Sequence, residues 1–211
     1  MENNFDFLDK YNASIDLPDS RDITVEELGM SFENAAAFPS VLLHAKTPLL
    51  NQGSIGACTI FGLSGATFES SYIDAVENGG VYNQPFDPWH FWAKAKERGA
   101  SDTLGWSLQG ALQLAVDLGY IAGYAKLATP GRLTLDTIIN VTNSGRIIYT
   151  GSARGNWRAI GATHIYEEGG NSGHAYCIPG YKPGFGTARN SWSEAWGDRG
   201  HFHIPEALLS K

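Results

Sequence analysis

The residues best suited to covalent chemistry lie in the segment Gln52-Gly53-Ser54-Ile55-Gly56-Ala57-Cys58. Cys58 is one of only two cysteines, and an apolar, helix-like run follows it directly. A sulfur at the N-terminus of a helix meets unpaired backbone N–H groups and the positive end of the helix dipole, which favour the nucleophilic thiolate. Gln52 lies six residues upstream, across two glycines, so its side-chain amide can turn back toward the same sulfur. The segment therefore predicts a nucleophile beside a candidate oxyanion donor.

A nucleophilic cysteine also needs a base that takes up its proton and a third group that orients this base. The chain has six histidines to choose from: His44, His90, His164, His174, His201 and His203. His174 is favoured because an apolar, strand-like run, residues 175–178, follows it directly. Asn190 comes sixteen residues later, on the next strand-like segment after a glycine-rich turn. Two neighbouring strands would place Asn190 beside the imidazole of His174.

Three blocks of the chain resemble those of the papain-like cysteine peptidases. The Gln52-to-Cys58 segment resembles the block that carries the family's oxyanion glutamine and nucleophile. Gly173-His174-Ala175 resembles the block with the base. Asn190-Ser191-Trp192, followed by Trp196-Gly197, resembles the block with the orienting asparagine and its covering tryptophan.

The order and spacing of these blocks also resemble the family. His174 and Asn190 lie 116 and 132 residues after Cys58, near the family's typical span. Leu17-Pro18-Asp19-Ser20-Arg21-Asp22 resembles the start of a mature papain-like domain, so the resemblance covers roughly residues 17–205. Any one block alone is a weak signal, whereas three in the right order are a strong one.

The resemblance implies an α+β fold of two lobes, with a helical lobe packed on an antiparallel sheet or barrel and the active-site cleft between them. It implies that Cys58 attacks a peptide carbonyl as a thiolate paired with protonated His174. The Cys58 backbone N–H and the Gln52 side chain would stabilise the oxyanion, while Asn190 orients the imidazole under the cover of Trp192. An acyl-enzyme would form and then be hydrolysed, without a cofactor or metal.

The segment Gly105-Trp106-Ser107 resembles the part of the family that pairs with the substrate backbone. The chain departs from the family's pattern at three positions. Trp106 stands where a second glycine is common, and Thr59 replaces the tryptophan usual after the nucleophile. Ile55 replaces a cysteine, so the usual nearby disulfide cannot form.

The cysteine count indicates the cellular compartment, and the charge composition limits the classes of partner. Two cysteines in 211 residues argue against a disulfide scaffold and indicate a reducing, cytoplasmic or otherwise intracellular compartment. Packaging in a virus particle or export by a dedicated machine stays open, because neither needs a signal peptide. Net charge is −7 and no Lys/Arg run occurs, which argues against nucleic acid and anionic membranes as partners. A peptide or protein substrate is expected, and the oligomeric state is unknown.

Periodicity predicts helices before about residue 120 and strands after it. Helices are expected at residues 24–37, 58–77, 87–98 and 108–118, and strands at 146–150, 174–178, 187–190 and 201–204. The domain predicted from this pattern spans residues 17–211. Its helical half covers about 50–120, and its β half covers about 121–211 together with the entry segment 17–45. Residues 1–16 are predicted to form an N-terminal arm that could lie over the cleft, and residues 23–45 include an insertion.

Three other residues could belong to the core or to a metal site. Cys177 is three positions from His174 on a strand, so it should point to the opposite face and belong to the core. His201 and His203 share a strand face, but no cluster of further ligands indicates a metal site. Two other functions remain open: an acyl or peptidyl transferase on the same triad, and a catalytically silent papain-like protein used for binding or structure.

Overall fold

The computed structural model describes residues 38–127, 133–153, 155–160, 163–170 and 173–209. The predicted arm at 1–16, the helix at 24–37 and most of the entry segment lie outside the described residues. Among the described residues, no helix combines the length and the apolar character needed to cross a membrane.

Three helices form the first half of the described chain, where the sequence predicts them. They are α1 (Cys58–Glu77), α2 (Pro88–Glu97) and α3 (Leu108–Asp117). Asp87 and Ser107 cap α2 and α3 by accepting hydrogen bonds from backbone N–H groups of the first turn. Gly119 follows the end of α3 and has a φ of +71°. A residue with a side chain is strained in this conformation, whereas glycine adopts it readily and lets the helix stop there.

In the described part of the chain, seven strands form one sheet: β1 (Leu42–Leu43), β2 (Ile148–Ser152), β3 (Gly155–Ile160), β4 (Thr163–Glu168), β5 (His174–Lys182), β6 (Phe185–Arg189) and β7 (His201–Pro205). Their order is β1-β5-β6-β7-β4-β3, and β2 also pairs with β5. All pairs are antiparallel except β4 with β7. The four predicted strands correspond to β2, β5, β6 and β7.

The sequence patterns missed four features of the β half: strand β1 in the entry segment, helix α4 (Leu135–Asn143), the β3–β4 hairpin and the short helix α5 (Glu206–Leu209). The α4 segment is rich in Thr, Ile and Val, which favour strands over helices when taken alone. It is helical because Thr134 caps it and because Ile138 and Val141, three residues apart, both enter the core beside the sheet.

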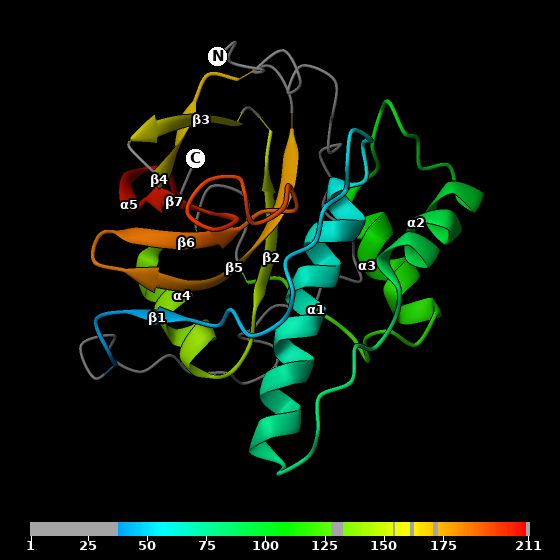
Figure 1. Cartoon of the computed structure of the whole chain (residues 1–211), viewed down its shortest axis with the longest axis horizontal. Coiled ribbons are helices and arrows are strands. Elements are labelled where there is room, and N and C mark those ends of the chain that lie inside the picture. Colours follow the sequence, from blue (N-terminus) through cyan, green and yellow to red (C-terminus); the bar gives the residue numbers. More distant parts are fainter. Residues whose placement is uncertain (1–37, 128–132, 154, 161–162, 171–172, 210–211) are drawn as a thin grey trace.

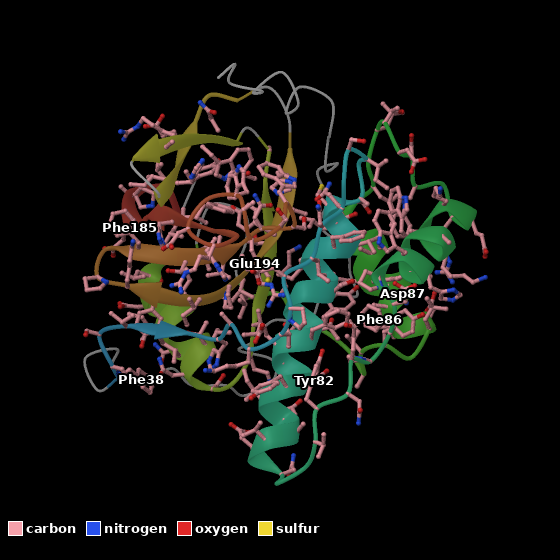
Figure 2. The ribbon with its side chains drawn as sticks, viewed as in Figure 1. Phe38, Tyr82, Phe86, Asp87, Phe185 and Glu194 are labelled. Atoms are coloured by element: carbon pink, nitrogen blue, oxygen red, sulfur yellow. The ribbon has the colours of Figure 1, made fainter. Side chains whose placement is uncertain are left out.

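Two hydrophobic cores confirm the two-lobed α+β architecture. One core joins α1, α2 and α3, and the other joins the sheet to α4 and α5. Helix α1 lies between the sheet on one side and α2 and α3 on the other (Figure 1). Figure 2 shows Tyr82 and Phe86 on the α2–α3 side of α1, where their rings pack against Tyr72 and Phe68 of that helix. Phe185 lies at the far end of the sheet.

Candidate active site

Cys58 is the first residue of α1 and is completely buried. Its helix begins without a side-chain cap, because the preceding residue, Ala57, has no acceptor to offer. Asp87, Ser107 and Thr134 cap α2, α3 and α4 with their side chains. The first N–H groups of α1 therefore have no capping side chain and stay available to an anion at this end of the helix.

Burial is the largest influence on the Cys58 thiol and raises its pKa to about 11. The backbone N–H groups of Ala175, Thr59 and Cys58 itself act in the opposite direction and lower the pKa. The helix end thus favours the thiolate as the sequence predicts, but desolvation outweighs it. A lone thiolate is unfavourable here, so the negative charge needs a partner.

His174, the first residue of β5, is hydrogen-bonded to Asn190, which follows the end of β6. The distance from His174 Nε2 to Asn190 Oδ1 is 2.7 Å. The same Oδ1 accepts a hydrogen bond from the Ser191 backbone N–H at 2.8 Å, which fixes the orientation of the Asn190 amide. Nε2 must therefore carry a proton in the neutral imidazole, and Nδ1 is then the acceptor.

Two indoles enclose the His174 ring. Its centroid lies 4.6 Å from that of Trp192 at an interplanar angle of 30°, and 5.4 Å from that of Trp157 at 88°. Burial lowers the pKa of His174 to about 4, and the hydrogen bond with Asn190 acts in the opposite direction. Trp192, predicted to cover this hydrogen bond, does lie against the imidazole. Trp157 was not predicted, because its strand, β3, was missed.

The segments of Cys58 and His174 meet through Ala175, the residue directly after His174. Its backbone N–H interacts with the Cys58 sulfur, so the start of β5 lies against the start of α1. Each group alone favours its neutral form in this buried position. Two opposite charges in such a buried place would stabilise each other, which a single charge could not achieve.

Gln52 is held on both sides and is almost completely buried. Its Oε1 accepts a hydrogen bond from Ser191 Oγ at 2.6 Å, and its Nε2 donates to the Ile55 carbonyl at 2.8 Å. Its backbone N–H donates to the Ser191 carbonyl at 2.9 Å. A side-chain amide nitrogen has two protons, so one N–H is left for an oxyanion. Ser191 therefore connects Gln52 with Asn190, a link that the sequence analysis did not assign.

Comparison with solved structures identifies the overall fold. No protein-family model matches the sequence, and the comparison with curated proteins finds no match. Among solved structures, xylellain, a cysteine protease from Xylella fastidiosa, superposes with a TM-score of 0.65 at 14% identity, over 96% of this chain and 91% of that one. Recombinant stem bromelain precursor gives 0.63 at 16% identity, over 99% and 75%. ProCathepsin B from Trypanosoma congolense gives 0.61 at 13%, over 96% and 84%.

The chain has the papain-like fold. Its two lobes follow that architecture, while Ile55 and Thr59 are the two departures from the expected sequence pattern beside Cys58. Thr59 is buried, and its backbone carbonyl accepts a hydrogen bond from Tyr149 Oη at 2.9 Å. Both described cysteines are free, so no disulfide braces this papain-like core.

The segment predicted to bind substrate backbone lies beside the nucleophile loop. A Cβ on Gly56 would come within 2.8 Å of the Gly105 nitrogen, so glycine permits this close approach. Ser107 Oγ is engaged in capping α3, where it accepts from Gly110 N at 2.8 Å. Trp106 packs against the same helix start. Binding of substrate by these three residues stays a prediction.

The remaining predictions about single residues concern the core and a metal. Cys177 is buried, with its sulfur against Gly65 of α1, as expected for a core residue. His203 lies 3.5 Å from an Asp198 carboxylate oxygen, and His201 Nδ1 donates to the Arg199 carbonyl at 2.8 Å. No group of three or more metal-binding side chains occurs among the described residues.

We expect the folded protein to lose stability as the pH falls below about 6.5, because burial holds the pKa of His174 at about 4. Below pH 6.5 the unfolded chain binds a proton at His174 that the folded chain does not bind. The stabilisation that comes from neutral His174 is therefore complete above pH 6.5 and is lost progressively toward pH 4. The pKa difference corresponds to roughly 3 kcal/mol of unfolding free energy in total, of which roughly 2 kcal/mol should be lost between pH 7 and pH 5. Chemical denaturation of wild type and His174→Gln at pH 7 and pH 5 measures it.

The exposed His90 provides the matched control for this pH dependence. His90→Gln should keep the wild-type loss of stability between pH 7 and pH 5, whereas His174→Gln should lose distinctly less. Burial also lowers the pKa values of His164, His201 and His203, so part of the slope will remain in His174→Gln. Equal slopes in wild type and His174→Gln would contradict the assignment.

Proposed function

We propose that this protein is a cysteine peptidase in which Cys58 is the nucleophile and His174 is the base. The observation that carries the proposal is the buried hydrogen bond between His174 and Asn190, with the Cys58 sulfur at the amide that follows His174. This arrangement supplies a nucleophile, a base with its acceptor nitrogen unoccupied by Asn190, and an orienting group. These are the three parts that nucleophilic acyl transfer requires.

In the proposed reaction, Cys58 transfers its proton to His174 Nδ1 and the sulfur attacks the peptide carbonyl carbon. The carbonyl oxygen becomes an oxyanion, which faces the N–H groups at the start of α1 and the remaining N–H of Gln52. The C–N bond then breaks, and His174 gives its proton to the departing amine. Water, deprotonated by His174, releases the acyl group from the sulfur and restores the thiol.

Labelling with a peptide that carries a thiol-directed electrophile tests this proposal on the full chain. The expected product is one covalent adduct, located at Cys58 by mass spectrometry of the digested protein. Cys177 is equally buried and provides the internal control, since it should stay unlabelled. If folded protein at neutral pH is not labelled at Cys58, or if both cysteines react equally, the peptidase proposal fails.

Replacement of Gln52 by alanine should lower kcat by about 10²- to 10³-fold, the usual effect of removing one oxyanion donor. KM should change little, because the donor acts mainly on the charge that forms in the transition state. Steady-state kinetics with a fluorogenic peptide measures both constants.

Alkylation by iodoacetamide is the control for the Gln52 variant, because this reaction forms no oxyanion. Cys58 of Gln52→Ala should therefore be alkylated at close to the wild-type rate, although this variant cleaves peptides slowly. A parallel loss of both rates would mean that Gln52 acts through the packing of the nucleophile loop instead.

A further inference from the structure

One face of α1 connects the nucleophile to a buried ion pair. Cys58, Gly62, Gly65 and Glu69 follow each other at spacings of four, three and four residues, so they form one stripe along the helix. A Cβ on Gly62 would lie 3.1 Å from the Tyr176 backbone, and one on Gly65 would lie 3.4 Å from the Cys177 sulfur. This face therefore packs directly on β5, the strand that begins with His174.

Glu69 and Arg189 form the ion pair at the far end of this stripe, and both side chains are buried. Glu69 accepts hydrogen bonds from Thr47 Oγ1 at 2.6 Å and from the Thr47 backbone N–H at 2.9 Å. Arg189 donates to Thr47 Oγ1 at 2.8 Å and to the Pro48 carbonyl at 2.5 Å. The ion pair is thus fixed by several directional bonds, in a place where a lone charge would be costly.

Arg189 also lies directly before Asn190 in the chain. It is the last residue of β6 and is paired with Cys177 of β5 and His201 of β7. The ion pair therefore ties the helix of Cys58 to the strand that leads into the residue orienting His174.

We propose that Glu69 and Arg189 are positioning residues, which set the axial register of α1 against β5 and β6 and thereby the placement of Cys58 relative to His174. This inference rests on the proposed function of the Cys58–His174 pair. Glu69 comes eleven positions after Cys58, about 16 Å further along the helix axis, and the helix between them is nearly rigid. A shift at one end of α1 is therefore carried to the other.

The contact of Gly62 and Gly65 with β5 cannot hold the register as sharply, because both glycines present a smooth surface and apolar contacts are non-directional. The hydrogen bond from Tyr149 Oη to the Thr59 carbonyl is directional, but it lies in the first turn of α1 and ties the helix to β2. Glu69 is the first charged residue of α1, and its partner is planar and forked, so their hydrogen bonds define one position. A displacement of about 1 Å at a reacting group can reduce a rate by about 100-fold.

A double variant separates the effect of the ion pair on the placement of Cys58 from its effect on the stability of the fold. Glu69→Gln alone leaves a buried cation without its anion, so Tm should fall by about 10 °C. Glu69→Gln combined with Arg189→Met removes both charges, keeps an acceptor for Thr47, and should regain most of that Tm. If the pair positions the site, kcat of the double variant stays about 100-fold low with KM unchanged, and Cys58 alkylation at neutral pH slows in parallel.

The exposed ion pair between Arg98 and Asp117, which joins the end of α2 to α3, is the matched control. Its double variant, Arg98→Met with Asp117→Asn, should keep wild-type kcat and alkylation rate. A Glu69→Gln/Arg189→Met protein that regains both Tm and kcat would overturn the proposal, because the pair would then be purely structural.

If that double variant does not fold, Arg189→Lys provides the test, since it keeps the positive charge but loses the forked guanidinium group. A reduced kcat at constant KM supports the positioning role, whereas unchanged kcat with a lowered Tm overturns it. Alkylation does not depend on peptide cleavage. If wild-type protein is alkylated rapidly at Cys58 but cleaves no peptide, the proposed function is refuted. The positioning role can then still be tested by the alkylation rate of the variants.

Discussion

Cys58→Ala should abolish peptide cleavage, with a loss in kcat of about 10⁴- to 10⁶-fold, while the protein stays folded. Cys58 combines the N–H groups at a helix start with contact to the segment of His174. Alanine is the best helix former and leaves only a small space in place of the sulfur, so α1 should form as before. Kinetics with a fluorogenic peptide, together with Tm and circular dichroism, measure both parts of this prediction.

Cys177→Ala is the matched control, since both cysteines are buried and free. Its kcat should stay within about tenfold of wild type, because its sulfur packs against Gly65 rather than at a helix N-terminus. Turnover by Cys58→Ala close to the wild-type rate would refute the assignment of the nucleophile.

His174→Gln should lower kcat to nearly the same level as Cys58→Ala, because the two groups act as one unit. Effects within such a unit are strongly non-additive, so the double variant should be hardly less active than either single one. Removal of the base also removes the partner that makes a buried thiolate favourable. The pKa of Cys58, raised by burial to about 11, should then govern its reactivity.

The alkylation rate as a function of pH checks this second prediction. Wild type should react appreciably at neutral pH, whereas His174→Gln should react only as the pH rises toward about 11. His164→Gln is the matched control, since this histidine packs against Trp196, at the edge of the same aromatic cluster. It should keep the wild-type pH profile, and a profile of His174→Gln that equals wild type would exclude His174 as the base.

The predicted site residues could be selected from the sequence because their signals are local. A cysteine before an apolar helical run, a histidine at the start of a strand and an asparagine before Ser-Trp each stand in a short block of characteristic residues. The helices α1, α2 and α3 were predictable for the same reason, since periodicity and the caps Asp87 and Ser107 act within one or two turns.

Elements whose local preference conflicts with their environment were missed. Helix α4 is rich in β-branched residues and forms because Ile138 and Val141 are buried beside the sheet. The β3–β4 hairpin joins the sheet through β7, far along the chain, and carries Trp157 to the ring of His174. Such pairings depend on contacts between distant segments, which no single window of sequence contains.

The sequence by itself determined the identity and order of the chemical groups: Cys58, then His174, then Asn190, with Gln52 before them. Only the tertiary structure decided the pKa values of these groups and the contacts that hold their segments in place. Burial raises the pKa of Cys58 and lowers that of His174 because desolvation depends on atoms from the whole fold, whereas the helix-end effect is local. The Glu69–Arg189 pair likewise joins residues 120 positions apart, so its place on the Cys58 face of α1 emerges only when helix and sheet pack together.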